Sequence, residues 1–154
     1  QMPQYGYSIY GLDPDRTAIA SARELDISRK AAREICNTIK GMFLDKAKEY
    51  LEDVIILKKS VPYKRHKKHV AHRKDLTGWP TGRFPQKAAG RILEVLENAE
   101  SNAEFKGLDV DRMKIIHACS HNGTILKRFT PRAHGSSSPK YNRLTHIEIA
   151  IEEV

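Results

Sequence analysis

The chain has 154 residues and a formal net charge of +8 at pH 7, and 40% of its residues are hydrophobic. This composition is typical of one compact domain, which we expect to span residues 1–154. No run approaches the roughly 20 apolar residues of a membrane span, and the N-terminal region lacks the layout of a secretory signal. We therefore expect a cytoplasmic protein, whose charge RNA, DNA or an anionic membrane surface could neutralise.

Basic residues concentrate in two segments that contain no Asp or Glu. Residues 58–74 contain eight Lys or Arg, and residues 112–147 contain seven. The acidic residues lie elsewhere, chiefly on a predicted helix and near the C-terminal end. This pattern indicates a nearly neutral body with two cationic extensions, and it favours the phosphates of a nucleic acid as their partner.

One strand and three helices are expected in the body. Residues 17–23 alternate small alanines with other side chains, which predicts a strand packed closely against a neighbour. A first helix is expected over 28–41, with Ser28 as its N-cap and a glycine at its end. A second is expected over 45–55. The clearest covers 85–107, with a proline in its first turn and a glycine closing it.

After the third helix the pattern changes to strands. Residues 114–120 form a short apolar run, and residues 145–152 alternate strictly between apolar and other side chains, as a half-buried strand requires. These two strands are expected to pair antiparallel. The segment that joins them, 123–143, is too long for a tight turn and has no helical period.

Two arrangements of that segment remain open from the residues alone. Asn122-Gly123 is a strong signal for a tight type I′ turn, which would leave the last strand with another partner. Alternatively the strands continue into a long hairpin, with Gly123 at a bulge or bend. Extended at about 3.3 Å per residue, residues 116–131 would span about 50 Å, well beyond the radius of gyration of about 13 Å of a small domain. Such a hairpin would project from the body.

Three histidines, His66, His69 and His72, recur every third residue in the first basic segment. Histidine is a common zinc ligand, but these are interleaved with Lys and Arg, whose charges oppose a divalent cation. No Cys or carboxylate stands at the spacing of a zinc finger. We therefore expect no metal and no cofactor, and contacts to phosphate or sugar instead.

An enzyme is the alternative from another class, with His134 or His146 as the general base of a hydrolase. No nucleophile elbow, Cys-His signature or glycine-rich phosphate loop accompanies these histidines. The sequence therefore predicts that the chain is not an enzyme. A free-standing RNA- or DNA-binding module is the closer rival, because the charge pattern suits it equally well.

Trp79 lies in the motif GWPTGRFP, between glycines and prolines. Its ring could stack on an RNA base, but a tryptophan that pins a loop onto the helix starting near Pro85 is the more common arrangement. We favour the second interpretation.

Several stretches resemble one protein family. They are ISRKAAREICNTIKGM, LKKSVPYKRH, TGWPTGRFPQKAA, ENAESNAEFKGLDVDRM, KRFTPRAHG and THIEIAI, which together cover most of the chain in order. They resemble the large-subunit ribosomal protein family designated L-twenty-two in bacteria. The insertion with VPYKRH and GWPTGRFP is similar to the archaeal and eukaryotic form, since bacterial members lack it.

The resemblance implies an α+β fold, with three helices packed on a small three-stranded antiparallel sheet and a long projecting β-hairpin. It implies a structural constituent of the large ribosomal subunit that binds large-subunit rRNA, aids assembly and lines the polypeptide exit tunnel with its hairpin. The expected partners are this rRNA, neighbouring ribosomal proteins and a nascent polypeptide at the hairpin tip, with no membrane. The expected location is the large subunit in the cytoplasm.

The residues expected to bind rRNA belong to a basic insertion loop, 58–84, and an extended hairpin tip, 123–143. They are Lys58, Lys59, Lys64, Arg65, His66, Lys67, Lys68, His69, Arg73, Lys74, Arg83, Lys127, Arg128, Arg132, His134, Lys140 and Arg143. By resemblance, the residues expected at the tunnel wall are Arg132, Ala133, His134, Gly135, Ser136, Ser137 and Ser138. The tip is less basic than the arginine-rich tips of many bacterial members.

Overall fold

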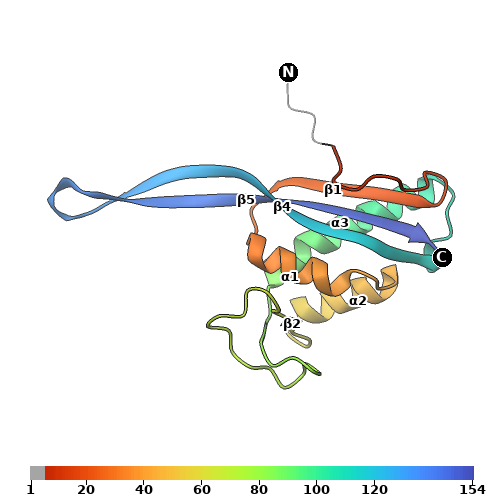
Figure 1. Ribbon diagram of the computed structural model, residues 1–154, viewed down its shortest axis with the longest axis horizontal. Helices are drawn as coiled ribbons and strands as arrows, with labels where there is room; N and C mark the ends of the chain where they lie inside the picture. Colours follow the sequence, from red (N-terminus) through yellow and green to blue (C-terminus); the bar gives the residue numbers. More distant parts are fainter. Residues whose placement is uncertain (1–5) are drawn as a thin grey trace.

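Three strands form an antiparallel sheet in the order β1-β5-β4, and helices pack against it (Figure 1). The computed structural model describes residues 6–154. Its elements follow the order expected for an α+β fold, and the predicted fold class is confirmed. They are β1 (Thr17–Leu25), α1 (Arg29–Ile39), α2 (Leu44–Ile55), β2 (Val61–Pro62), β3 (Gly82–Arg83), α3 (Gln86–Phe105), β4 (Met113–Pro131) and β5 (Ser137–Glu153).

The three helices lie where periodicity predicts them, and they differ only at their ends. Ser28 occupies the N-cap position of α1 with extended backbone, but its side chain makes no capping hydrogen bond. Helix α2 begins at Leu44, one residue before the predicted start. Pro85 precedes α3 instead of lying in its first turn. Within residues 6–154, no helix is long and apolar enough to cross a membrane.

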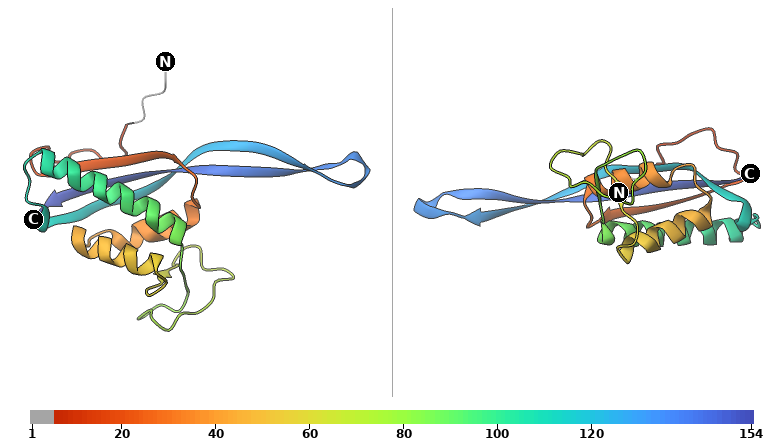
Figure 2. Two further views of the ribbon diagram at one scale, coloured as in Figure 1. Left: turned by 180° about the vertical axis from the view of Figure 1, so that it is seen from behind. Right: turned by 90° about the horizontal axis from the view of Figure 1, so that it is seen from below.

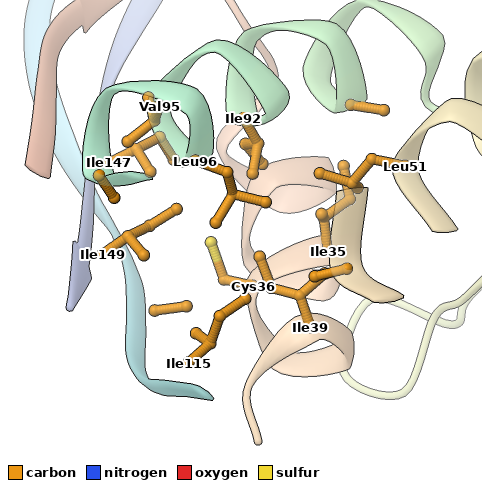
Figure 3. Close-up of a cluster of buried hydrophobic side chains, with 14 of the residues drawn as sticks. Ile35, Cys36, Ile39, Leu51, Ile92, Val95, Leu96, Ile115, Ile147 and Ile149 are labelled. Atoms are coloured by element: carbon orange, nitrogen blue, oxygen red, sulfur yellow. The ribbon is translucent and has the colours of Figure 1, made fainter. Parts of the chain in front are cut away.

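The core lies between the helices and one face of the sheet. Figure 3 shows Cys36 of α1 among side chains from α3 and the sheet, including Leu96, Ile115 and Ile149. All of these side chains are buried. Each large aliphatic side chain removed from water contributes about 1.5–3 kcal/mol, so this cluster is the main source of stability. Burial also raises the pKa of the Cys36 thiol to about 12.

Strand β1 packs closely against α3, as its alanines predict. Ala18 and Ala20 are buried on the helix side, and their small side chains let α3 approach. Polar side chains of α3 then reach the strand backbone. Asn102 Nδ2 donates to the Ile19 carbonyl at 2.9 Å, and Lys106 Nζ donates to the Thr17 carbonyl at 2.8 Å. The C-terminal half of α3 is thereby fastened along β1.

Residues 145–151 of β5 are buried on both faces, so the expectation of a half-buried strand over 145–152 was wrong. The alternate residues His146 and Glu148 are only 5% and 2% exposed. The segment before β1 covers this outer face, because the backbone N–H and the hydroxyl of Ser8 donate to Glu148 Oε2 at 2.9 and 2.7 Å. Arg23 of β1 lies 3.3 Å from the other carboxylate oxygen. The strict alternation of residues 145–152 therefore reflects a central strand in which both faces are buried, one of them apolar and the other polar.

Strands β4 and β5 continue past the body as a long hairpin (Figures 1 and 2). Their antiparallel register runs from Met113 opposite Glu153 to Pro131 opposite Ser137. The long hairpin is confirmed, and the tight turn at Asn122-Gly123 is excluded. The register shifts between Asn122 and Ile125, so Gly123 lies in a bulge, as the long-hairpin interpretation expects.

Gly123 is required by a close approach of the two strands and not by its φ angle. A Cβ atom at this position would lie 3.0 Å from the carbonyl carbon and oxygen of Leu144 and 3.2 Å from His146 Cε1. Backbone atoms cannot move aside cheaply. The glycine therefore lets β4 cross β5 closely where the hairpin leaves the body.

Candidate nucleic-acid interface

The insertion loop, residues 58–84, is held on the body by a buried carboxylate. Glu34 of α1 is 1% exposed. Its Oε2 accepts a hydrogen bond from the backbone N–H of Lys64 at 3.1 Å, and its Oε1 accepts from Arg65 and His66 at 2.9 and 2.8 Å. Hydrogen bonds to a charged acceptor offset much of the cost of burying it. The backbone is thus fixed while the side chains of Lys64 and Arg65 remain exposed.

Trp79 stabilises this loop through its indole N–H, whose hydrogen bonds lie within the loop and not on the helix after Pro85. Its Nε1 donates to the Tyr63 carbonyl at 3.0 Å and lies 2.8 Å from Thr81 Oγ1. The indole therefore joins the two arms of the loop near β2 and β3. Lys67 Nζ lies 5.5 Å from the centre of the ring, which is within range of a cation–π interaction.

Two predicted rRNA contacts at the start of the loop also have a carboxylate partner within the chain. Asp53 of α2 lies 3.1 Å from Lys58 Nζ and 2.7 Å from Lys59 Nζ. The hydrogen bonds from Lys59 and Lys58 hold the pKa of Asp53 below its ordinary value. Residues 58–74 contain no acid in the sequence, but folding brings Asp53 of α2 to this segment. One carboxylate leaves the trio with a net positive charge.

Arg73 and Arg83 are exposed, and each also contributes to loop structure. Arg83 donates to the His69 carbonyl at 3.2 Å, and Arg73 Nε donates to the Gly82 carbonyl at 3.3 Å. The Arg73 guanidinium lies 5.0 Å from the centre of the Phe84 ring. The remaining predicted loop residues, His66, Lys68, His69 and Lys74, are exposed or half-buried at its surface.

The hairpin has two different faces. On one face Phe129 and Tyr141 form an edge-to-face pair with ring centres 6.4 Å apart. On the other face Arg128 stands directly opposite Lys140. Like charges in opposed positions destabilise a strand pair by up to about 1 kcal/mol, and an anion between them would remove that cost. The second face therefore suits phosphate, and the first combines exposed aromatic rings with Lys127, which stands opposite Tyr141.

The hairpin ends in a short turn over Ala133–Gly135. The backbone N–H of Arg132 donates to the Ser136 carbonyl at 2.8 Å, and Arg132 Nε donates to Ser138 Oγ at 3.1 Å. His134 adopts a φ of 57°. The predicted tip residues are thus brought together in one small, hydroxyl-rich turn. All predicted hairpin contacts, Lys127, Arg128, Arg132, His134, Lys140 and Arg143, are exposed.

The insertion loop and the end of the hairpin are far apart (Figure 1). Helix α1 begins between the loop and the hairpin root, the part near Gly123 where the hairpin leaves the body. Helix α1 presents Arg29, Lys30 and Arg33 outside the core, whereas Ala31, Ala32 and Ile35 are buried. Sequence reasoning missed these three cations because it searched for acid-free runs and α1 contains Glu34. Their helical spacing away from the apolar stripe was the signal that could have identified them.

Neither candidate histidine is arranged as a catalytic base. His146 is buried, its Nδ1 accepts the backbone N–H of Glu24 at 3.0 Å, and its Nε2 lies 3.4 Å from Glu24 Oε1. This pairing secures the irregular end of β1 against the hairpin root. His134 is exposed in the tip turn. In the described part of the chain, no group of three or more His, Cys, Asp or Glu could hold a metal ion.

Comparison with known proteins gives one consistent result. The family model described as "Ribosomal protein L22p/L17e" matches residues 20–152. Large ribosomal subunit protein uL22 of Methanosphaera stadtmanae is 50% identical over 147 residues, which is 96% of this chain and 96% of that protein. The proteins of the same name from Methanopyrus kandleri and Cenarchaeum symbiosum are 53% and 49% identical, covering 92% and 99% of this chain and 90% and 99% of their own lengths. The chain therefore belongs to the ribosomal protein L22p/L17e family.

Proposed function

We propose that this chain is a structural, rRNA-binding constituent of the large ribosomal subunit, on the cytoplasmic ribosome. The observation that carries the proposal is family membership across residues 20–152, with relatives named as large-subunit proteins. The family is one of ribosomal proteins and not of enzymes. The excess of positive charge and the two basic extensions agree with this role.

Binding is driven chiefly by phosphate neutralisation. Exposed Lys and Arg of the insertion loop and hairpin replace the counterions condensed on closely packed RNA, and the released ions supply favourable entropy. Such binding weakens steeply with salt and depends little on base identity. Shape and backbone geometry then decide where the protein binds, as in most recognition of folded RNA.

The hairpin has a second role in this proposal, as part of the wall of the polypeptide exit tunnel. It projects from the body, and the turn at its end, residues 132–138, carries three serine hydroxyls and a single Lys or Arg, Arg132. A polar, weakly charged tip offers a nascent polypeptide little to adhere to. The body remains at the subunit surface, where it contacts neighbouring ribosomal proteins and helps RNA segments assemble around it.

The insertion loop supplies the sharpest test of the phosphate mechanism. Replacing Lys64, Arg65, Lys67 and Lys68 together with Ala should weaken binding to purified large-subunit rRNA. For every phosphate that the variant no longer neutralises, the slope of log K against log salt should fall by roughly 0.7–0.9. The matched control removes four cations from α2 and α3, namely Lys46, Lys48, Lys87 and Arg91. An unchanged salt slope in the loop variant would refute its phosphate role.

A further inference from the structure

Three neighbouring surface hollows, linked by lining residues that they share, lie between the two basic extensions. The first, of about 350 Å³, includes Tyr63 and Lys68 of the loop region. It shares Arg65 and His66 with the second, of about 360 Å³. The second shares its other end, Arg29 and Asn122, with a third hollow of about 160 Å³ at the hairpin root. We call this series the α1 track.

The α1 track is lined by cations and contains no carboxylate among its lining residues. Its middle hollow brings Arg29 and Arg33 of α1 beside Arg65 of the loop. Among the described residues, neither the Arg33 guanidinium nor the Arg65 guanidinium has a carboxylate partner, and only the backbone N–H of Arg65 contacts Glu34. Three guanidinium groups around one polar hollow repel each other. An anion placed between them would attract all three and make the net interaction favourable. The hollow also contains Ser120, whose buried hydroxyl has no hydrogen-bond partner in the part of the chain described.

The walls of the track are fixed by contacts that do not involve a ligand. Glu34 holds the backbone of Arg65 and His66 in place. The Arg29 guanidinium is hydrogen-bonded to Asn122 Oδ1, which ties the start of α1 to the bulge of β4. A preformed site loses less conformational entropy on binding than one that must be ordered by its ligand.

We propose that the α1 track binds one continuous single strand of RNA that passes from the insertion loop, across the start of α1, to the root of the hairpin. This inference rests on the proposed function and adds a binding surface and a path to it. Arg29, Arg33 and Arg65 contact consecutive parts of the phosphate backbone. The ring of His66 and the guanidinium planes give bases a surface on which to stack.

The track makes the two basic extensions a single binding surface. The charge pattern of the sequence separates them by an intervening helix and a stretch rich in acids, whereas α1 joins them in the fold (Figure 2). An RNA strand on the track would therefore engage loop, helix and hairpin root together. Separate patches would bind independently of one another.

The test uses the full chain and a uridine oligonucleotide of about nine residues, within the range of about 4–16 nucleotides that single-strand sites cover. Backbone amide resonances near all three hollows, for example those of Ser28, His66 and Leu144, should shift together at one RNA concentration. Shifts that saturate at different concentrations in the loop and the hairpin root would overturn the continuous track.

A pair of double variants tests the middle hollow. Arg33→Ala with Arg65→Ala should bind the oligonucleotide about tenfold more weakly, and its salt slope should fall by about 1.4, or about 0.7 for each phosphate left without its arginine. The matched control, Arg91→Ala with Arg112→Ala, removes arginines that lie beside Glu94 and Glu153. It should stay within about twofold of the unmodified chain. Equal affinity of the two variants would overturn the proposal.

The stability of each variant and its association with large subunits are measured separately from RNA binding. Arg33 and Arg65 are exposed, so the track variant should keep its unfolding temperature. Arg33→Lys with Arg65→Lys should restore most of the affinity by restoring the charge. If the unmodified chain joins large subunits but the track variant binds the oligonucleotide normally, the track is wrong and the proposed function stands. If the unmodified chain does not join large subunits, the proposed function itself fails.

Discussion

The carboxylate of Glu34 accepts a hydrogen bond from the backbone N–H of His66 at 2.8 Å, across 32 positions of the chain. Two further N–H groups of the same loop, those of Lys64 and Arg65, also donate to this carboxylate. A buried acid thereby positions the most basic part of the molecule without neutralising its exposed side chains. Glu34 therefore fixes the geometry of the loop backbone, while the exposed Lys and Arg side chains supply its charge.

Glu34→Ala should destabilise the protein by about 3 kcal/mol, because three backbone N–H groups lose a charged acceptor in a buried place. Glu34→Gln retains one acceptor oxygen and should cost about 1 kcal/mol. Urea unfolding measures both changes. Glu94→Ala, which removes an exposed carboxylate beside Arg91, is the control and should cost less than about 1 kcal/mol. Equal effects at the two glutamates would contradict the anchoring role of Glu34.

Two glycine substitutions should change stability in opposite directions. Gly123→Ala places a Cβ 3.0 Å from the Leu144 backbone and should destabilise by about 1–3 kcal/mol. Gly90→Ala lies inside α3 with no atom within 4 Å of the new Cβ. It should stabilise by up to about 1 kcal/mol, because alanine is the better helix former. Thermal unfolding of both variants distinguishes them, and a stabilised Gly123→Ala would rule out the close crossing at the bulge.

Glu148 should make stability depend on acid pH. Burial raises its pKa, but the hydrogen bonds from Ser8 and the charges of His121 and Arg23 outweigh that effect and lower the pKa below its ordinary value. The unfolded chain then binds the proton more readily than the native one. The stabilisation is complete above the unfolded pKa of about 4.3 and is lost as pH falls through the native pKa.

Glu148→Gln should therefore reduce the loss of unfolding free energy between about pH 5 and pH 2. Urea titrations across that range provide the measurement. Glu97→Gln alters a carboxylate on the exposed surface of α3 and should leave the acid limb of the profile in place. If the unfolding free energy of Glu148→Gln fell with pH in parallel with that of the unmodified chain, Glu148 would not be the cause of the acid dependence.

The distal hairpin should be dispensable for folding. Among the described residues, none between Ala118 and Thr145 is buried. Replacing residues 127–141 with Asn-Gly, between the paired residues Leu126 and Asn142, should leave one cooperative unfolding transition. Calorimetry of the shortened chain tests this, and loss of cooperativity would mean that the hairpin belongs to the core.

The elements with regular patterns could be predicted from the sequence, and so could the exposed basic residues. The period of Ala32, Ile35 and Ile39 reports a helix because each faces the same core. The two-sided burial of β5 could not be predicted, since the cover over Glu148 comes from Ser8, 140 positions away. Local periodicity records which face is apolar and does not record what covers the polar one.

The exposed cations of the candidate site could be predicted from the sequence, but the carboxylates that hold the loop in place could not. Runs without acids identified the loop and hairpin, but Asp53 reaches Lys59 only through the turn after α2. Glu34 resembles an ordinary solvent-facing helix residue until the loop folds over it. The cations of α1 were not predicted for a related reason. Since α1 contains both acidic and basic residues, counting charges along the sequence does not show that the basic ones share one exposed face. Tertiary contacts decide these points, and no short-range pattern encodes them.

The most direct measurement is sucrose-gradient fractionation of an extract of the source cells at moderate and at high salt, with the protein followed by mass spectrometry. The chain should co-sediment with the large subunit in equal amounts. It should also resist the salt wash, because in the assembled subunit neighbouring proteins and folded RNA hold it in addition to the salt-sensitive phosphate contacts. A chain that stays at the top of the gradient at both salt concentrations would contradict the proposed role, and a free-standing nucleic-acid-binding module would then account better for its charge.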